Sequence, residues 1–279
     1  MNHSIGFMQG RLCDCVDGKI QAFPWDDWEK EFTIAAAIKF HLIEWTLDYE
    51  DLYKNPLMTA YGQKKILSLC QKYGISILSL TGDCFMQQPF WKVSGQAQAD
   101  LKSDLLEIIR ACSVVGIQMI VIPLVDSGRI DTKHQENELV HFLLEQHPYL
   151  LDHRIQIIFE SDFPPDELRR FISRFPLDSF GINYDVGNSA ALGYNTSEEL
   201  ASYGSRVLNV HVKDRLLRGT TVPLKAGNAN FKETFIALAK QHYKGNFILQ
   251  TARAGNGVSH VEALCNYRDM TQQWIHQFM

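Results

Sequence analysis

The feature that most constrains the fold of this chain is a regular alternation of short apolar runs with longer amphipathic stretches. There are eight such runs, each about as long as one strand. They show little internal alternation of polar and apolar residues, which is typical of strands buried on both faces in a parallel sheet. The expected strands cover residues 5–8, 42–46, 75–80, 119–123, 155–159, 180–184, 207–210 and 247–249.

The stretches between these runs have the apolar pattern of helices that pack one face on a core. Gly74 and Gly116 stand where two of these stretches should end before the next strand. Thr196, followed by Ser-Glu-Glu, is a typical helix start with an acidic first turn. The expected helices cover residues 26–39, 60–73, 97–115, 135–151, 165–174, 196–203, 231–242 and 258–278.

Eight strand–helix units in 279 residues match the count of a (β/α)8 TIM barrel. The main rival is a doubly wound open sheet, which would carry a G-x-G-x-x-G turn after its first strand. The segment "FMQGRLCDC" supplies no such turn, and no linker or shift in composition divides the chain. We therefore expect an α/β fold in which residues 1–279 form a single TIM-barrel domain.

The charge of the chain restricts its partners. The formal net charge is -5, and the sequence contains no run of basic residues. Binding to nucleic acid through phosphates needs a concentration of positive charge, so we do not expect a nucleic-acid partner. A small anionic substrate remains compatible with this composition, because two or three local Arg or Lys side chains suffice to hold it.

The cysteines and the apolar segments suggest the compartment. The six cysteines are scattered, and their one close pair has C-x-C spacing rather than the C-x-x-C of redox and zinc motifs. No run approaches the ~18 apolar residues of a membrane span, and the first residues lack the pattern of a signal peptide. We expect a cytoplasmic protein with free thiols and no membrane partner.

Polar side chains follow four successive expected strands. Glu160, Asp185, His211 and Gln250 each come directly after an apolar run. Any one of them alone is as well explained by helix capping or by a local ion pair. In a closed barrel, however, the carboxyl ends of the strands converge on one mouth. Two carboxylates, an imidazole and an amide oxygen there form a plausible site for one divalent metal ion.

Further side chains are expected around the same mouth. Lys213 lies two residues beyond His211, so it should point to the same side of the strand and act in catalysis. Arg253, or alternatively Arg11 or Arg215, is suited to bind a phosphate or carboxylate of the substrate. The remaining substrate contacts that we expect are Glu44, Asp83, Trp91 and Asn188, with Trp91 in a loop that we interpret as a lid.

These motifs together resemble those of the xylose isomerase-like TIM barrels, and in particular their sugar and sugar-phosphate isomerase/epimerase branch. The resemblance extends from "GFMQGRL" to "FILQTARAG". Its motif points are Glu160 in "FES", Asp185 in "NYDVGN", His211 in "HVKD" and the stretch "LKAGNANF". The pair formed by "HVKD" and "D-x-G-N" one unit earlier is fairly specific, whereas either motif alone is weak.

The resemblance implies a catalytic divalent metal ion, usually Mn²⁺, Mg²⁺, Co²⁺ or Zn²⁺. In the family's epimerases the metal is held by Glu, Asp, His and Glu, and the two glutamates shuttle a proton at a carbon next to a carbonyl. Carried over by position, Glu160 is the first glutamate, and Asp185 and His211 are ligands. Gln250 occupies the place of the second glutamate.

Gln250 departs from the family pattern in a way that changes the expected mechanism. An amide oxygen can still bind a hard cation, but it does not take up or release a proton as a carboxylate does. Glu160 then needs a second acid or base, for which Glu44, Asp83 and Lys213 are candidates. Alternatively a single base suffices, as in an aldose–ketose isomerisation or a dehydration.

We therefore expect a metal-dependent isomerase or epimerase that acts on a sugar or sugar phosphate, with Glu160, Lys213 and Gln250 in its catalytic machinery. An inosose-type dehydratase on the same barrel is one alternative. A non-catalytic sugar-binding protein with a degenerate site is another. An endonuclease of the same superfamily is less compatible, because only His211 is placed at a strand end. Association into a homo-oligomer is left open.

Overall fold

Eight parallel strands close into a barrel, as the spacing of the apolar runs predicts. The computed structural model describes residues 3–255 and 257–279. Around the barrel the strands follow the order β1-β10-β7-β6-β5-β4-β3-β2, and all neighbouring pairs are parallel. The strands are β1 (Ile5–Met8), β2 (Leu42–Thr46), β3 (Ser76–Thr81), β4 (Met119–Leu124), β5 (Gln156–Ser161), β6 (Phe180–Asp185), β7 (Val207–Val212) and β10 (Asn246–Leu249).

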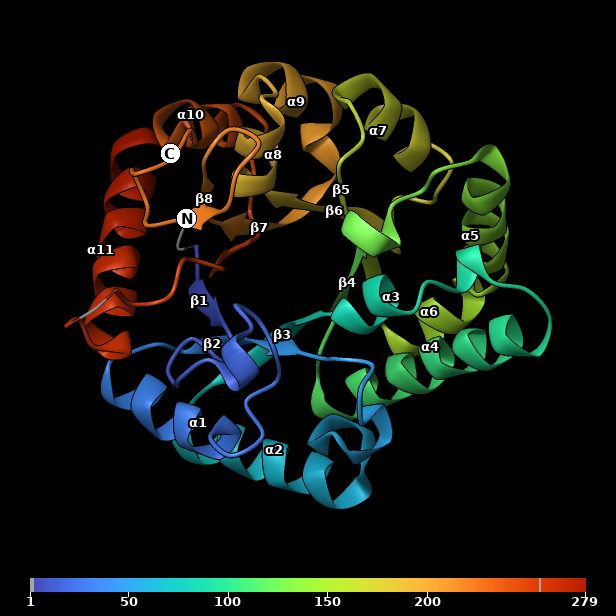
Figure 1. The fold of residues 1–279 in the computed structure, drawn as a ribbon, viewed down its shortest axis with the longest axis horizontal. Coiled ribbons are helices and arrows are strands. Elements are labelled where there is room, and N and C mark those ends of the chain that lie inside the picture. Colours follow the sequence, from blue (N-terminus) through green and yellow to red (C-terminus); the bar gives the residue numbers. More distant parts are fainter. Residues whose placement is uncertain (1–2, 256) are drawn as a thin grey trace.

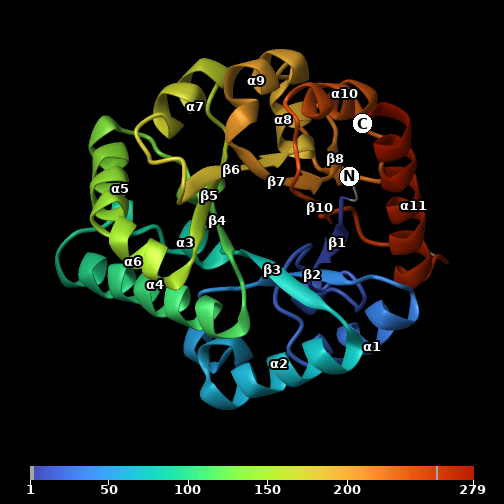
Figure 2. The ribbon, with the colours of Figure 1, turned by 180° about the vertical axis from the view of Figure 1, so that it is seen from behind.

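The larger helices form a ring outside the strands, which both opposite views show (Figure 1, Figure 2). Among the described residues no helix is both long and apolar enough to cross a bilayer. The ring consists of α1 (Trp28–Ala37), α2 (Ala60–Tyr73), α4 (Gly95–Val115), α5 (Lys133–Glu145), α6 (His147–His153), α7 (Pro165–Ile172), α9 (Thr196–Tyr203), α10 (Phe231–Lys240) and α11 (His260–Phe278). Short 3-10 turns lie at Val16–Gly18, Leu52–Lys54, Pro56–Met58, Phe90–Lys92, Asp126–Gly128 and Gly204–Arg206.

One expected helix, over residues 135–151, is two helices in the structure. The break falls at Gln146, between α5 and α6. Pro148 is the second residue of α6, and proline has no backbone N–H with which to continue the hydrogen bonds of the preceding helix. Proline fits the first turn of a new helix, where that N–H would have no partner within the helix. Pro148 therefore explains why the expected single helix is divided into α5 and α6.

Alternation along the strands divides the apolar core from the polar barrel interior. In β2, Ile43 and Trp45 belong to the large cluster that also contains buried residues of the helices. Leu42 belongs to a separate small cluster with Met8 and Ile248. Since successive side chains of a strand point to opposite faces, Glu44 lies on the same face of β2 as Leu42, inside the barrel. The same alternation places His211 inside, between Val210 and Val212 of the outer cluster.

Three small elements inside the ring of helices were not expected. They are α3 (Asp83–Gln87), α8 (Val186–Leu192) and a hairpin of β8 (Asp214–Arg215) and β9 (Thr221–Val222) (Figure 1). Helices α3 and α8 begin within two residues of the ends of β3 and β6. Their shortness explains why apolar periodicity did not reveal them, since five to seven residues span fewer than two turns of α-helix. They bring additional side chains to the carboxyl end of the barrel.

The segment expected to be a lid over the substrate is part of the core instead. Phe90 and Trp91 are only 1% and 2% exposed, and both belong to the main apolar cluster. The ring of Phe90 contacts that of Phe142 on α5 edge to face, with 5.1 Å between centroids. Burial of large aromatic rings accounts for this placement, so Trp91 in this structure is not an exposed substrate contact.

Candidate active site

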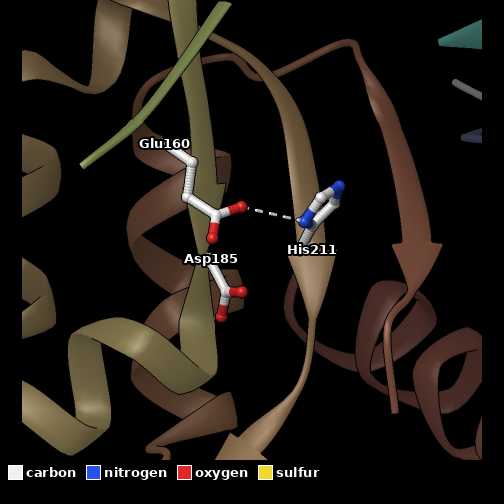
Figure 3. A group of neighbouring side chains, drawn as sticks. All are labelled: Glu160, Asp185 and His211. Atoms are coloured by element: carbon white, nitrogen blue, oxygen red, sulfur yellow. Dashed lines mark ion pairs between the residues drawn. The ribbon is translucent and has the colours of Figure 1, made fainter. Parts of the chain in front are cut away.

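Three ionisable side chains meet at the carboxyl end of the barrel. Glu160, Asp185 and His211 come from the neighbouring strands β5, β6 and β7, and all three are buried. One ligand atom from each lies within 4.8 Å of the others, and Figure 3 shows the two carboxylates stacked beside the imidazole. The side chains that the sequence places after successive strands are thus brought together. They are the last or nearly last residues of their strands rather than the first residues of loops.

Both oxygens of Glu160 are held by amide groups. Asn183 on β6 donates to Oε2 at 2.9 Å, and Asn188 on α8 donates to Oε1 at 2.7 Å. The Nδ1 atom of His211 lies 3.2 Å from Oε2. Burial alone would raise the pKa of Glu160, but the histidine and Lys213 outweigh it and lower that pKa below its ordinary value. Glu160 is therefore an ionised carboxylate near neutral pH, fixed in one orientation.

The imidazole of His211 is fully buried and is oriented from behind by Glu44. Its Nε2 atom lies 2.7 Å from Oε1 of Glu44. On the other side of the ring, Nδ1 is within ion-pair distance of Glu160 but is not aligned for a hydrogen bond with any described residue. Burial alone would lower the pKa of His211, whereas the two glutamates raise it to about 10.

Glu44 sits deeper in the barrel than expected for a substrate contact. It is 0% exposed, and its oxygens accept hydrogen bonds from several polar groups in addition to His211. Its further donors are Ser79 Oγ at 2.6 Å, Thr81 Oγ1 at 2.6 Å and Asn209 Nδ2 at 3.1 Å. A carboxylate with its acceptor sites filled in this way has no free oxygen to offer to a substrate hydroxyl. In this structure Glu44 contacts His211 instead, which differs from the substrate contact that the sequence suggests.

Asp185 links the strand end to the next helix and to a cation. Its Oδ1 accepts a hydrogen bond from the backbone N–H of Asn188, which caps the N-terminus of α8. Its Oδ2 accepts a hydrogen bond from Lys213 Nζ at 3.1 Å. Burial raises the pKa of Asp185, and the charge of Lys213 opposes this effect. The carboxylate is thereby held beside Glu160, as Figure 3 shows.

Gln250 is the first member of a chain of side-chain hydrogen bonds. Its Oε1 accepts from Lys213 Nζ at 3.1 Å, and its Nε2 donates to Oε1 of Gln21 at 2.9 Å. Gln21 in turn donates through Nε2 to Oδ2 of Asp83 at 2.5 Å. Gln250 is 7% exposed. The chain joins the ends of β7, β10 and β3 through the loop after β1, so that Gln250 and Asp83 belong to one polar network.

Asp83 is the first residue of α3, two positions after the end of β3, and it is 7% exposed. Burial raises its pKa to about 7, although the hydrogen bond from Gln21 opposes the rise. The nearby charges of Glu160 and Lys213 act on the same carboxyl group with opposite signs. Asp83 is thus an acid that changes its protonation state close to neutral pH, electrostatically coupled to the group around Glu160.

Two further expected residues have different surroundings. Asn188 is well placed, because its Oδ1 accepts from Lys213 at 3.2 Å and from Arg215 at 2.8 Å while its Nδ2 donates to Glu160. Arg253 does not extend into this group. Its guanidinium donates to backbone carbonyls of Gly10, Cys13 and Ile20 and so holds the loop after β1. In this structure Arg253 therefore supports that loop, which differs from the substrate contact that the sequence suggests.

Sequence reasoning missed Gln21, Asn183 and Asn209. Gln21 lies in the loop after β1, where no periodicity marks the position of a side chain. Asn183 and Asn209 sit within strands that were identified, two residues before Asp185 and His211 respectively. Because strand side chains alternate, that spacing puts them on the same inner face as the ligands. The alternation was therefore a usable signal for the two asparagines.

The chemistry of this donor set fits a divalent cation. Two carboxylates and an imidazole nitrogen are hard and borderline ligands of the kind that Mn²⁺, Mg²⁺, Co²⁺ and Zn²⁺ accept. The buried Nδ1 of His211 has no aligned partner in the described part of the chain, while Nε2 is directed at a carboxylate. Such a carboxylate–histidine pair is the usual support of a metal-binding imidazole. Glu160, Asp185 and His211 are thus suited to hold one ion.

Comparisons with known proteins agree with the fold. The family model described as xylose isomerase-like TIM barrel matches residues 32–270. A comparison with curated proteins gave no match. A xylose isomerase domain protein from Planctomyces limnophilus has a similar structure, with 17% identity, a TM-score of 0.74, and coverage of 99% of this chain and 98% of that chain.

Two further solved structures have the same architecture. One is a D-psicose 3-epimerase in the presence of D-fructose, with 11% identity, a TM-score of 0.76, and coverage of 98% of this chain and 99% of that chain. The other is the IOLI protein with a bound zinc atom, with 13% identity, a TM-score of 0.77, and coverage of 99% of both chains. At these identities the likeness establishes the barrel fold alone.

Proposed function

The chain belongs to the xylose isomerase-like TIM barrel family, and we propose that it is a metal-dependent isomerase or epimerase of a sugar or sugar phosphate. The observation that carries the proposal is the convergence of Glu160, Asp185 and His211 within 4.8 Å, with Glu44 buried behind the histidine. This arrangement provides an ionised base and three ligands for one divalent ion. The zinc bound to the IOLI protein and the epimerase activity named for the D-psicose enzyme support the same assignment.

In the proposed reaction Glu160 removes a proton from the carbon next to the substrate carbonyl. Its two amide partners, Asn183 and Asn188, hold the carboxylate in place, and its lowered pKa keeps it ionised before the reaction. The ammonium group of Lys213 stabilises the negative charge that develops on the carbonyl oxygen. A bound divalent cation supplies Lewis-acid polarisation of that carbonyl. Glu160, Asp185 and His211 are its proposed ligands.

Gln250 has a supporting part in this proposal. Its Oε1 faces Lys213, and an amide oxygen in that position is able to act as a fourth, neutral ligand or to accept a substrate hydroxyl. Because it does not transfer a proton, the chemistry does not depend on Gln250 as an acid or base. A one-base dehydration of an inosose-type substrate is a second candidate function, favoured specifically by the amide at this position.

The cations near the site favour an anionic substrate over a neutral one. Lys213 and Arg215 both hydrogen-bond to Asn188, which itself holds Glu160. Two positive groups this close to the proposed base are suited to a phosphate or carboxylate on the sugar.

All six cysteines are unpaired, which supports our placement of the protein in the reducing cytoplasm.

Metal content and proton exchange test the proposed function. The purified protein should contain about one equivalent of a divalent metal, and Asp185→Asn should reduce that content while the exposed control Asp166→Asn should not. Incubation in D₂O with a panel of ketohexoses and their phosphates should place deuterium next to a carbonyl. Absence of metal from both the wild type and the control would refute the ligand assignment. Metal without exchange on any sugar would instead favour a non-catalytic sugar-binding protein.

A further inference from the structure

An epimerisation needs a second proton-transfer group, and the residues around the proposed site restrict which group it is. Epimerisation removes a proton from one face of a carbon and returns one to the other face. Glu160 serves one face, and the amide of Gln250 does not serve the other. The candidates that the sequence suggests for this second group are Glu44, Lys213 and Asp83. The inference below rests on the proposed function and specifies its stereochemical course.

Glu44 is excluded by its position. It is 0% exposed, and its oxygens accept from Ser79, Thr81, Asn209 and the ring of His211. A substrate carbon would have to displace the imidazole to reach it. The geometry therefore leaves Glu44 with a supporting role only.

Lys213 is excluded as a base by its hydrogen bonds. Its Nζ atom has three acceptors, namely Asp185 Oδ2 at 3.1 Å, Asn188 Oδ1 at 3.2 Å and Gln250 Oε1 at 3.1 Å. Three donated hydrogen bonds use all three hydrogens of an ammonium group, which has no lone pair to accept a proton. Delivery of a proton as an acid would also require Lys213 to break one of these three hydrogen bonds, so it is placed to stabilise negative charge instead.

The orientation of the two amides follows from this ammonium group. Since Lys213 only donates, Gln250 must present its oxygen to it and direct its NH₂ group at Gln21. Gln21 must then present its oxygen to Gln250 and its NH₂ group to Asp83. Every group in the chain is fixed by its neighbour, and the chain ends at an acceptor, the Oδ2 atom of Asp83.

The other oxygen of Asp83 is uncommitted. No described residue donates a hydrogen bond to Oδ1, and Asp83 as a residue is 7% exposed. The carboxyl group therefore has one oxygen fixed by Gln21 and one available to a ligand. With a pKa raised to about 7 by burial, this group both donates and accepts protons in the neutral range.

We propose that Asp83 is the second proton-transfer group of the reaction, that Gln21 positions it, and that the enzyme is consequently an epimerase that inverts a carbon next to a carbonyl. Asp83 then supplies the carboxyl group that Gln250 lacks. It follows β3, whereas Gln250 follows β10, and both strands end at the same mouth of the barrel.

In the proposed epimerisation one proton leaves the carbon and another returns to its opposite face. The Glu160 carboxylate takes the proton from one face of the carbon, and the electron pair of the broken C–H bond forms the C=C bond of an enediolate. The negative charge passes to the former carbonyl oxygen. The protonated Asp83 then delivers its proton to the other face of the same carbon, and the carbonyl re-forms. Glu160 ends protonated and Asp83 ends as a carboxylate, and exchange with water restores both groups.

The test compares inversion with proton exchange in the wild type, Asp83→Asn and Asp83→Glu. Substrates are the panel of ketohexoses and ketohexose phosphates in D₂O. We expect Asp83→Asn to lose inversion by 100-fold or more while it still exchanges deuterium with retained configuration through Glu160. Asp83→Glu should recover part of the inversion. Since Asn still accepts a hydrogen bond from Gln21, metal content should match the wild type and the unfolding temperature should be no lower than that of the wild type, which excludes a folding defect.

Positioning by Gln21 has its own readout. Gln21→Leu removes the hydrogen bond to Asp83 and should lower kcat for inversion about 10-fold with little change in KM, whereas exchange through Glu160 should continue. The exposed control Gln96→Leu on α4 should change neither rate.

The outcomes separate this inference from the proposed function. Inversion by Asp83→Asn within threefold of the wild type would overturn the role of Asp83 alone. Isomerisation without inversion by the wild type would overturn the assignment as an epimerase and leave a metal-dependent isomerase. A wild type that exchanges no proton of any sugar would overturn both proposals.

Discussion

Glu44 Oε1 and His211 Nε2 lie 2.7 Å apart although 167 residues separate them in the chain. Glu44 is at the middle of β2 and His211 is near the end of β7, on strands that do not pair with each other in the barrel. Both side chains are 0% exposed. The contact therefore crosses the barrel interior, and it directs the opposite nitrogen of the imidazole at Glu160.

Glu44→Gln should weaken metal binding without unfolding the protein. Glutamine still offers an oxygen to His211, but it lacks the charge that fixes the imidazole and increases its strength as a ligand. Loss of such a support typically costs 10–100-fold in metal affinity. Competition with a coloured chelator measures this change, with the exposed Glu50→Gln as a control. Affinity equal to that of the wild type would mean that the Glu44–His211 contact plays no part in metal binding.

Metal uptake should release a proton and should be favoured by higher pH. Without metal, Glu44 and Glu160 outweigh the effect of burial and raise the pKa of His211 to about 10, so the imidazole carries a proton on each nitrogen near neutrality. A cation that binds Nδ1 must displace one of these protons. Affinity measured between pH 6 and pH 8 should therefore rise by up to tenfold for each pH unit, since one proton is released. Affinity independent of pH would show that the imidazole is already neutral.

The barrel and the candidate metal ligands can be predicted from the sequence for one physical reason. A strand buried on both faces reads as an apolar run, and the first polar residue after the run marks where the strand reaches the mouth. Glu160, Asp185 and His211 all follow this rule. The predicted carboxyl ends of these strands fall one or two residues too early, because the polar residues after the apolar run still take part in the hydrogen bonds between strands.

The residues that support the ligands were less predictable. The sequence marks Glu44 as an acid within a strand, but nothing local indicates that it faces an imidazole on a distant strand. Gln21 lies in a loop, where side-chain direction depends on tertiary packing rather than on any period. Trp91 was misjudged because its loop was assumed to be exposed, whereas burial in the core accounts for its ring.

Asp83→Asn should stabilise the protein at high pH. The pKa of Asp83 in the folded state, about 7, lies above the ordinary value of 3.8, so the folded protein retains a proton that the unfolded chain releases. The free energy of unfolding therefore falls as the pH rises between these two values. Asparagine does not ionise, so it removes this loss of stability at high pH, and its side-chain oxygen still accepts the hydrogen bond from Gln21. Urea unfolding of the metal-free proteins should show the variant more stable by up to about 4 kcal/mol at pH 8 and nearly equal to the wild type at pH 4. An equal difference at both pH values would contradict the raised pKa.

Arg253→Ala should lower stability rather than substrate affinity. Its guanidinium donates to the carbonyls of Gly10, Cys13 and Ile20, and loss of these bonds leaves acceptors of the loop after β1 without a partner. We expect the free energy of unfolding to fall by about 1–3 kcal/mol. KM for a phosphorylated sugar should stay within twofold in Arg253→Ala and rise in the comparison variant Arg215→Ala. A larger KM effect for Arg253 would restore it as a substrate contact.

Gln250→Glu should reverse the hydrogen-bond chain and alter Asp83. A carboxylate at position 250 accepts from Lys213 but has no N–H to donate to Gln21. Gln21 then has to turn its NH₂ group towards residue 250, so its amide oxygen faces Oδ2 of Asp83. In the wild type the amide nitrogen of Gln21 takes that place, 2.5 Å from Oδ2. Two oxygens at that distance repel unless Asp83 holds a proton, so its pKa should rise above about 7.

Carboxyl ¹³C chemical shifts of Asp83 measure this rise directly. The comparison variant Gln250→Met also removes the amide, but it leaves Gln21 free to keep donating to Asp83, so the pKa should stay near that of the wild type. An equal rise in both variants would mean that a changed local polarity, and not the direction of the amides, controls Asp83. No rise in Gln250→Glu would mean that Gln21 does not couple the two positions.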